Sequence, residues 1–156
     1  MINFEELLRE FGPLIGLDSL VPNEYHACSI RLNDFPDLSF QIQMDRVSSQ
    51  VLIVGEIIDV PPGIYKQQVF RAALFSNSEL YPRIGTLSYS DKNSTLVLHD
   101  FIPLEHLDGN KLYNYILAFS IKCNEWKQSV ETGQLPDTPE DTEGNAPLPS
   151  SPFDIK

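Results

Sequence analysis

Residues 51–58 read Val-Leu-Ile-Val-Gly-Glu-Ile-Ile, and this stretch decides the fold. The run is too short to span a membrane and too rich in β-branched residues for a comfortable helix, so it predicts a buried strand. Residues 61–63, Pro-Pro-Gly, end the strand, because proline offers no N–H to a ladder and glycine lets the chain turn. Apolar residues then recur every three or four positions over 65–75, which predicts a helix. The strand is apolar on both faces and the helix has a wide apolar stripe. Both must therefore pack against other polypeptide surfaces on more than one side.

The segments around this stretch alternate between apolar and polar side chains. Residues 27–32 and 38–45 have the period of two that is typical of strands with one buried face. Short polar connections join them to the 51–58 strand, so the three predict an antiparallel meander. After the helix, residues 86–90 and 95–102 predict a hairpin around a four-residue turn, with apolar side chains on both of its faces.

Two further helices are predicted at the ends of this sheet. Asn3 followed by Glu6 is a capping signal for an amphipathic helix, which Gly12 and Pro13 should break. Asp108 is the predicted N-cap of a long final helix that reaches Val130 with a straight apolar stripe. The predicted fold class is therefore α+β: a five-stranded, mostly antiparallel, twisted sheet with three helices in the order α-β-β-β-α-β-β-α.

Composition narrows the function classes. The chain has 156 residues and a formal net charge of -11, with 11 basic residues scattered among 22 acidic ones. Nucleic acid and membrane surfaces attract clustered Lys and Arg, so both are disfavoured as partners. The sequence has neither a run long enough for a transmembrane helix nor the start of a signal peptide, so we expect a cytoplasmic protein without membrane insertion. Cys28 and Cys123 are expected to be reduced core thiols.

The sequence divides into one domain and a tail. Residues 1–132 are long enough to bury a single core without metals or disulfides. Residues 133–156 hold five of the 12 prolines and five acidic residues against one lysine. Such a segment buries too little apolar surface to offset the entropy of ordering, so we expect an acidic, proline-rich, disordered tail.

No group of residues has the pattern of a catalytic or metal centre. Glu105, His106 and Asp108 lie in a loop, with only His26 and His99 as distant partners for a metal. The sequence has no Gly-rich phosphate loop, nucleophile elbow or recognisable Cys and His pair. We therefore predict no enzyme activity, no catalytic residue, no metal site and no cofactor.

The order of elements and several short motifs resemble the class I type III secretion chaperones, of the CesT and SycE type. The resemblance covers residues 4–130. Its motifs are a first strand at 28–32, a third strand at 51–57, a helix that ends Ala-Leu-Phe-Ser-Asn at 73–77, Ile-Gly-Thr-Leu at 84–87 before a hairpin, and a final helix with Phe119 and Trp126. The break at Gly12 and Pro13 and the tail depart from the family pattern.

The resemblance implies a bacterial, cytoplasmic homodimer that binds the N-terminal segment of one or more effector proteins in extended form. Such a chaperone keeps the segment soluble and directs it to the export apparatus, which makes the secretion ATPase an additional candidate partner. An extended segment gains backbone hydrogen bonds at a sheet edge while its side chains enter apolar pockets. Two alternatives stay open: a regulatory or adaptor domain that binds a folded partner, and, less favoured, a small enzyme.

Two sets of apolar residues are the predicted sites. The first helix and the meander are the candidates for the cargo groove, although the same residues can equally form the core. The predicted cargo-binding residues are Leu7, Leu8, Phe11, Ile30, Leu32, Phe40 and Ile42. The resemblance places the dimer interface on the middle helix and the second hairpin, at Tyr65, Val69, Phe70, Ala73, Leu87 and Val97.

Overall fold

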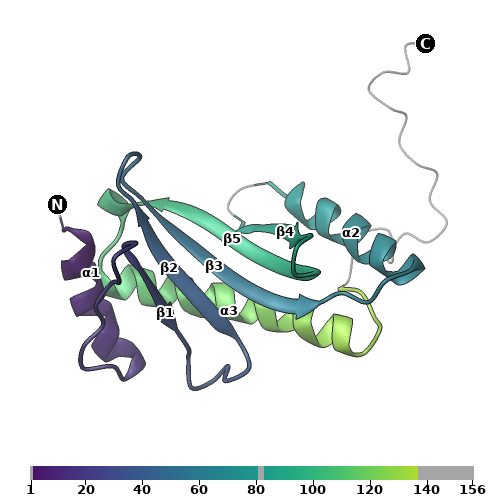
Figure 1. Cartoon of the computed structure of the whole chain (residues 1–156), viewed down its shortest axis with the longest axis horizontal. Helices are drawn as coiled ribbons and strands as arrows, with labels where there is room; N and C mark the ends of the chain where they lie inside the picture. The colour runs from purple at the N-terminus through teal and green to yellow at the C-terminus, as the bar shows by residue number, and fades with distance from the viewer. Residues whose placement is uncertain (1, 81–82, 137–156) are drawn as a thin grey trace, which may run out of the picture.

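The computed structural model describes residues 2–80 and 83–136 (Figure 1). The predicted order of elements is confirmed, with two short 3-10 helices added. The elements are α1 (Phe4–Phe11), η1 (Gly12–Ile15), β1 (Ala27–Ile30), β2 (Ser39–Asp45), β3 (Gln50–Asp59), α2 (Ile64–Asn77), β4 (Thr86–Ser90), β5 (Thr95–Pro103), η2 (Leu104–His106) and α3 (Gly109–Glu131).

The five strands form one antiparallel sheet in the order β1-β2-β3-β5-β4. The predicted meander is therefore confirmed, and the second hairpin adds to it through β5. The stretch that decided the fold, β3, lies in the middle of the sheet, with a register irregularity between Glu56 and Ile58. β1 and β4 are the two edge strands.

The helices lie on one side of the sheet (Figure 1). α3 runs beneath the strands, with α1 near its beginning and α2 near its end. The ring of Phe119 on α3 packs edge-on against Phe40 of β2, with 5.8 Å between the centroids. Gly55 of β3 permits this approach, because a Cβ atom there would lie 2.9 Å from Phe119 and 3.0 Å from Phe40. In the described chain no helix covers the opposite face of the sheet, where Leu52 and Val54 are half-buried.

The helix ends follow the sequence signals. Asn3 and Glu6 form the predicted capping box, and Asp108 caps α3 by accepting the N–H of Lys111 at 2.8 Å. α1 ends at Phe11, and the chain continues through Gly12 and Pro13 as the short 3-10 helix η1, which confirms the predicted break. α1 and α3 are in direct contact. The N–H of Gly109, at the start of α3, donates to the carboxylate of Glu10 on α1 at 2.9 Å.

Both cysteines are free and buried. Burial raises the pKa of the Cys28 thiol to about 11 and that of Cys123 to about 12, so both thiols stay protonated near neutral pH. Most of the predicted tail, residues 137–156, lies outside the described residues. No described helix has the length and hydropathy to cross a membrane.

Candidate functional site

The seven residues predicted to line a cargo groove all lie in the core of the protomer. None of their side chains is more than 5% exposed. They join α1 to β1 and β2 and hold the helix layer on the sheet. Their contact with cargo stays a prediction, and the accessible surface at this end of the molecule is made by other residues.

Two adjoining grooves follow α1. One, of about 370 Å³, lies between α1 and the segment 18–22. The other, of about 430 Å³, lies between the start of α1, the end of β2 and η2. Glu5 and Pro22 line both grooves, so the two are continuous around these residues. Of the predicted cargo residues, only Leu8 lines either groove.

A string of exposed apolar side chains runs between α1 and β1. Val21 and Tyr25 are 72% and 69% exposed, and Leu14 and Leu17 are 41% and 38% exposed. Apolar side chains gathered at a surface mark sites of association. The sequence analysis missed Leu17, Val21 and Tyr25 because residues 16–26 form no helix or strand, so no periodicity singles them out.

The β1 edge of the sheet lies beside this apolar string. The carbonyl of His26 accepts the N–H of Met44, which sets the side of β1 that faces β2. Since backbone groups alternate along a strand, those of Ala27 and Ser29 face outward. Asn23 already bonds Ala27, through Ala27 N to Asn23 Oδ1 at 3.1 Å and Asn23 N to Ala27 O at 2.8 Å. The outward N–H and C=O of Ser29 are therefore placed to pair with another extended segment.

The β4 edge is likewise occupied by an Asn side chain, at Leu87. The amide of Asn77, at the end of α2, donates to the carbonyl of Leu87 and accepts its N–H, both at 2.8 Å. Arg83 in turn donates to the backbone carbonyl of Asn77 at 2.7 Å. The side chain of Asn77 thus takes the place of a neighbouring strand at Leu87.

The residues predicted for a dimer interface lie on two different faces. Phe70, Ala73 and Leu87 line an apolar groove of about 200 Å³ between α2 and β4. The exposed side chain of Leu74 also lines this groove. Val97 lies on the opposite face of the sheet, because Leu87 pairs with Leu98 and the neighbouring Ser88 pairs with Val97.

The remaining two predicted interface residues, Tyr65 and Val69, pack inward. Val69 is fully buried, and the hydroxyl of the half-buried Tyr65 donates to the carbonyl of Gln134 at 2.7 Å. On the open face, Val97 shares its surface with Leu52, Val54 and the 48% exposed Phe101. The open face and the α2–β4 groove are thus two separate apolar surfaces.

Comparison with known protein families shows to which family this chain belongs. The sequence profile of the Tir chaperone protein (CesT) family matches residues 6–127. The chain belongs to the Tir chaperone (CesT) family. This confirms the resemblance stated from the sequence motifs.

Solved structures share the CesT-family fold. A chain of the HopA1–SchA chaperone–effector complex has a TM-score of 0.66 and 18% identity, over 80% of this chain and 93% of that one. A chain of the ExsC–ExsE complex has a TM-score of 0.63 and 15% identity, over 81% and 92%. A chain of the Yersinia pestis complex of the type III secretion chaperone SycH with a stable YscM2 fragment has a TM-score of 0.60 and 12% identity, over 78% and 97%. No curated protein sequence matches this chain.

The histidines of this CesT-family chain lie apart. His26 contacts Arg46, with 3.3 Å between Nε2 and Nη1, while Nδ1 of His99 contacts Ser88 Oγ at 3.2 Å. His106 contacts only the neighbouring Glu105, and both side chains are exposed. Within residues 2–80 and 83–136, no three potential metal-ligating side chains come together.

Proposed function

We propose that this CesT-family chain is a type III secretion chaperone that binds the N-terminal region of one or more effectors in extended form. Binding would keep the segment soluble in the bacterial cytoplasm and direct it to the export apparatus, with the secretion ATPase as a further partner. The family membership supports this proposal, and so do the similar folds that occur in complexes with effectors.

The observation that carries the proposal is an open strand position beside exposed apolar side chains and two grooves of mixed polarity. A cargo strand that adds to β1 at Ser29 gains backbone hydrogen bonds. Its larger side chains reach Val21, Tyr25 and the grooves along α1. Asn77 occupies the β4 edge at Leu87, as Asn23 occupies the β1 edge at Ala27, so the grooves and exposed apolar residues beside β1 favour that edge for cargo. The net charge of -11 favours basic or polar cargo segments and keeps an apolar surface soluble.

We also propose a homodimer that covers the α2–β4 groove and the open face around Val97. The α2–β4 groove and the open face lie on opposite faces of the sheet, next to the β4 edge. A two-fold symmetric interface that covers both surfaces must therefore extend around that edge. The blocked edge means that the two copies meet through side chains, without a shared β-ladder at Leu87.

We propose a role other than catalysis, and the family membership supports it. The three histidines contact different neighbours, and His26, which shares a groove with Glu5, contacts Arg46. An adaptor that binds a folded partner would use the same surface, and the following experiment separates it from a chaperone.

The test is co-expression of the full chain with the N-terminal segment of a candidate effector, followed by affinity purification. The double variant Val21→Asp, Tyr25→Asp should lose the segment, because two charges replace exposed apolar contacts. The matched control is Val47→Asp, since Val47 is 97% exposed in the β2–β3 turn. Recovery of only a folded partner, or equal binding by both variants, would overturn the proposal.

A further inference from the structure

The end of α3 turns the chain back toward α2. Gly133 has a φ of +72° and donates its N–H to the carbonyl of Val130, and the N–H of Gln134 donates to Ser129 O at 2.8 Å. This pair of bonds is a Schellman motif, which ends a helix and reverses the chain. The hydroxyl of Tyr65 on α2 then holds the carbonyl of Gln134. The residues that follow α3, 133 and 134, therefore lie against α2.

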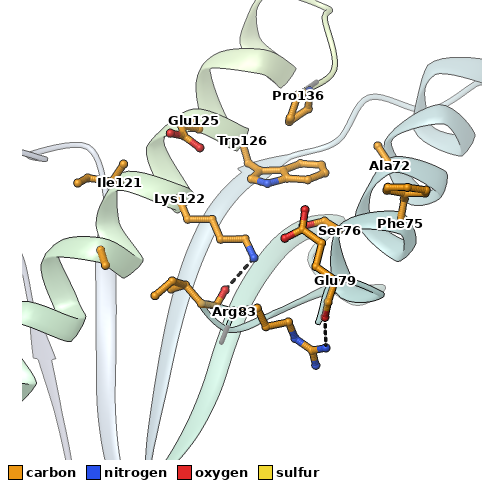
Figure 2. Close-up of a pocket in the computed structure, with 12 residues that line it drawn as sticks. Ala72, Phe75, Ser76, Glu79, Arg83, Ile121, Lys122, Glu125, Trp126 and Pro136 are labelled. Carbon is orange, nitrogen blue, oxygen red and sulfur yellow. Dashed lines mark hydrogen bonds between the residues drawn. The ribbon is translucent and has the colours of Figure 1, made fainter. Parts of the chain in front are cut away.

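A groove of about 420 Å³ lies between α2 and α3 at this exit (Figure 2). Pro136, the last described residue, lines the groove together with Trp126, and Leu135 packs against the core. Phe75 of α2 and the 52% exposed Ile121 of α3 add apolar walls. Aromatic walls of this kind are the surface on which proline-containing extended segments dock.

Lys122 supplies the polar feature of the groove. Its ammonium donates to the carbonyl of Ile84 at 2.7 Å (Figure 2), and burial lowers its pKa. Glu79 on the other wall attracts this ammonium, yet no carboxylate of the described chain lies within 4 Å of it. A partly desolvated ammonium is stabilised by a carboxylate that enters the site.

We propose that residues 137–143 of the same chain bind in this groove. They read Asp-Thr-Pro-Glu-Asp-Thr-Glu and continue directly from Pro136 at its rim. From Trp126 to Ala118 the groove follows about two turns of α3, or roughly 11–12 Å. An extended, proline-containing chain covers that length in about four residues at ~3.1 Å each.

This arrangement gives two residues of the α3 wall, Ile121 and Lys122, a partner in the segment. Pro139 reaches the apolar wall at Ile121, and the carboxylates of Asp137 and Glu140 flank Lys122. Attachment to Pro136 raises the effective concentration of the segment to about the millimolar range, which favours the same chain over any other occupant. The proposal assigns a role to the start of the tail and is independent of cargo binding.

Disulfide trapping in the full-length chain tests the proposal. One variant carries Ile121→Cys with Pro139→Cys, and the matched control carries Ile121→Cys with Pro152→Cys. The native thiols are buried and do not compete. Residues 121–136 are folded, so a free tail closes loops of only three and sixteen residues counted from Pro136, and loop length alone makes the first disulfide form about twelvefold faster. A docked segment should raise this ratio to at least about a hundredfold.

The alternatives have separate outcomes. A ratio near twelve would overturn the proposal, because the segment would then sample the groove no more than a free tail does. A disulfide between two chains, seen as doubled mass without reductant, would also overturn it and assign the groove to a second copy.

Discussion

Replacing Asn77 is the simplest test of the two hydrogen bonds that its side chain makes with the backbone of Leu87 at the β4 edge. Asn77→Ala deletes both hydrogen bonds to the backbone of Leu87, each 2.8 Å long and partly buried. At about 1 kcal/mol per hydrogen bond, the loss is about 2 kcal/mol. Alanine favours a helix over asparagine by roughly 0.5 kcal/mol, so the net destabilisation should be about 1.5 kcal/mol. For a domain of this size that corresponds to a fall in Tm of roughly 3–6 °C.

The assay is urea unfolding combined with hydrogen exchange. The matched control is Ser78→Ala, which removes only an exposed hydroxyl bond to Phe75 at the same helix end. Its cost should stay below about 0.5 kcal/mol. In the Asn77 variant the amide of Leu87 should exchange at least about tenfold faster, because its acceptor is gone. The reasoning is refuted if the two variants are equally stable, or if the Leu87 amide is already unprotected in the unaltered protein.

Three further predictions address the fold and the proposed dimer. Gly109→Ala should cost about 1–3 kcal/mol in urea unfolding, because the new Cβ would lie 2.6 Å from the Cβ of Glu10 and 2.9 Å from its carbonyl carbon; unchanged stability would show that α1 and α3 do not pack this closely. Val97→Asp should give a monomer by light scattering with unchanged circular dichroism, and a dimer mass would argue against the open face as part of the interface. Cys28 and Cys123 should resist a thiol-reactive dye at pH 8 until urea unfolds the chain, since burial raises the pKa of both thiols; rapid labelling of the native protein would contradict their burial.

Local signals in the sequence were enough to predict the elements. The capping pairs, the Pro-Pro-Gly stop and the period-two strands act within a few residues, and the structure confirms each of them. The order of the strands in the sheet depends on contacts between distant residues, which one sequence does not display. The pairing of Asn77 with Leu87, ten residues away across a turn, is such a contact.

The sites were harder to predict for a related reason. Apolar residues with a regular period mark the face that folds inward, so the selected cargo residues, such as Phe11 and Phe40, lie in the core. The exposed apolar residues Val21 and Tyr25 lie in a segment that is neither helix nor strand, so their spacing has no helical or strand period. Leu87 and Val97 were grouped together because the family resemblance placed the dimer interface on their hairpin, although strand register places them on opposite faces.

The most direct test of the central claim is hydrogen exchange with mass spectrometry, on the full chain with and without an effector's N-terminal segment. If cargo adds as a strand to the open edge, amides of β1 and of residues 17–25 should gain protection. The β4 amides should stay unchanged. Protection at β4 without protection at β1, or binding with no change at either edge, would contradict the account.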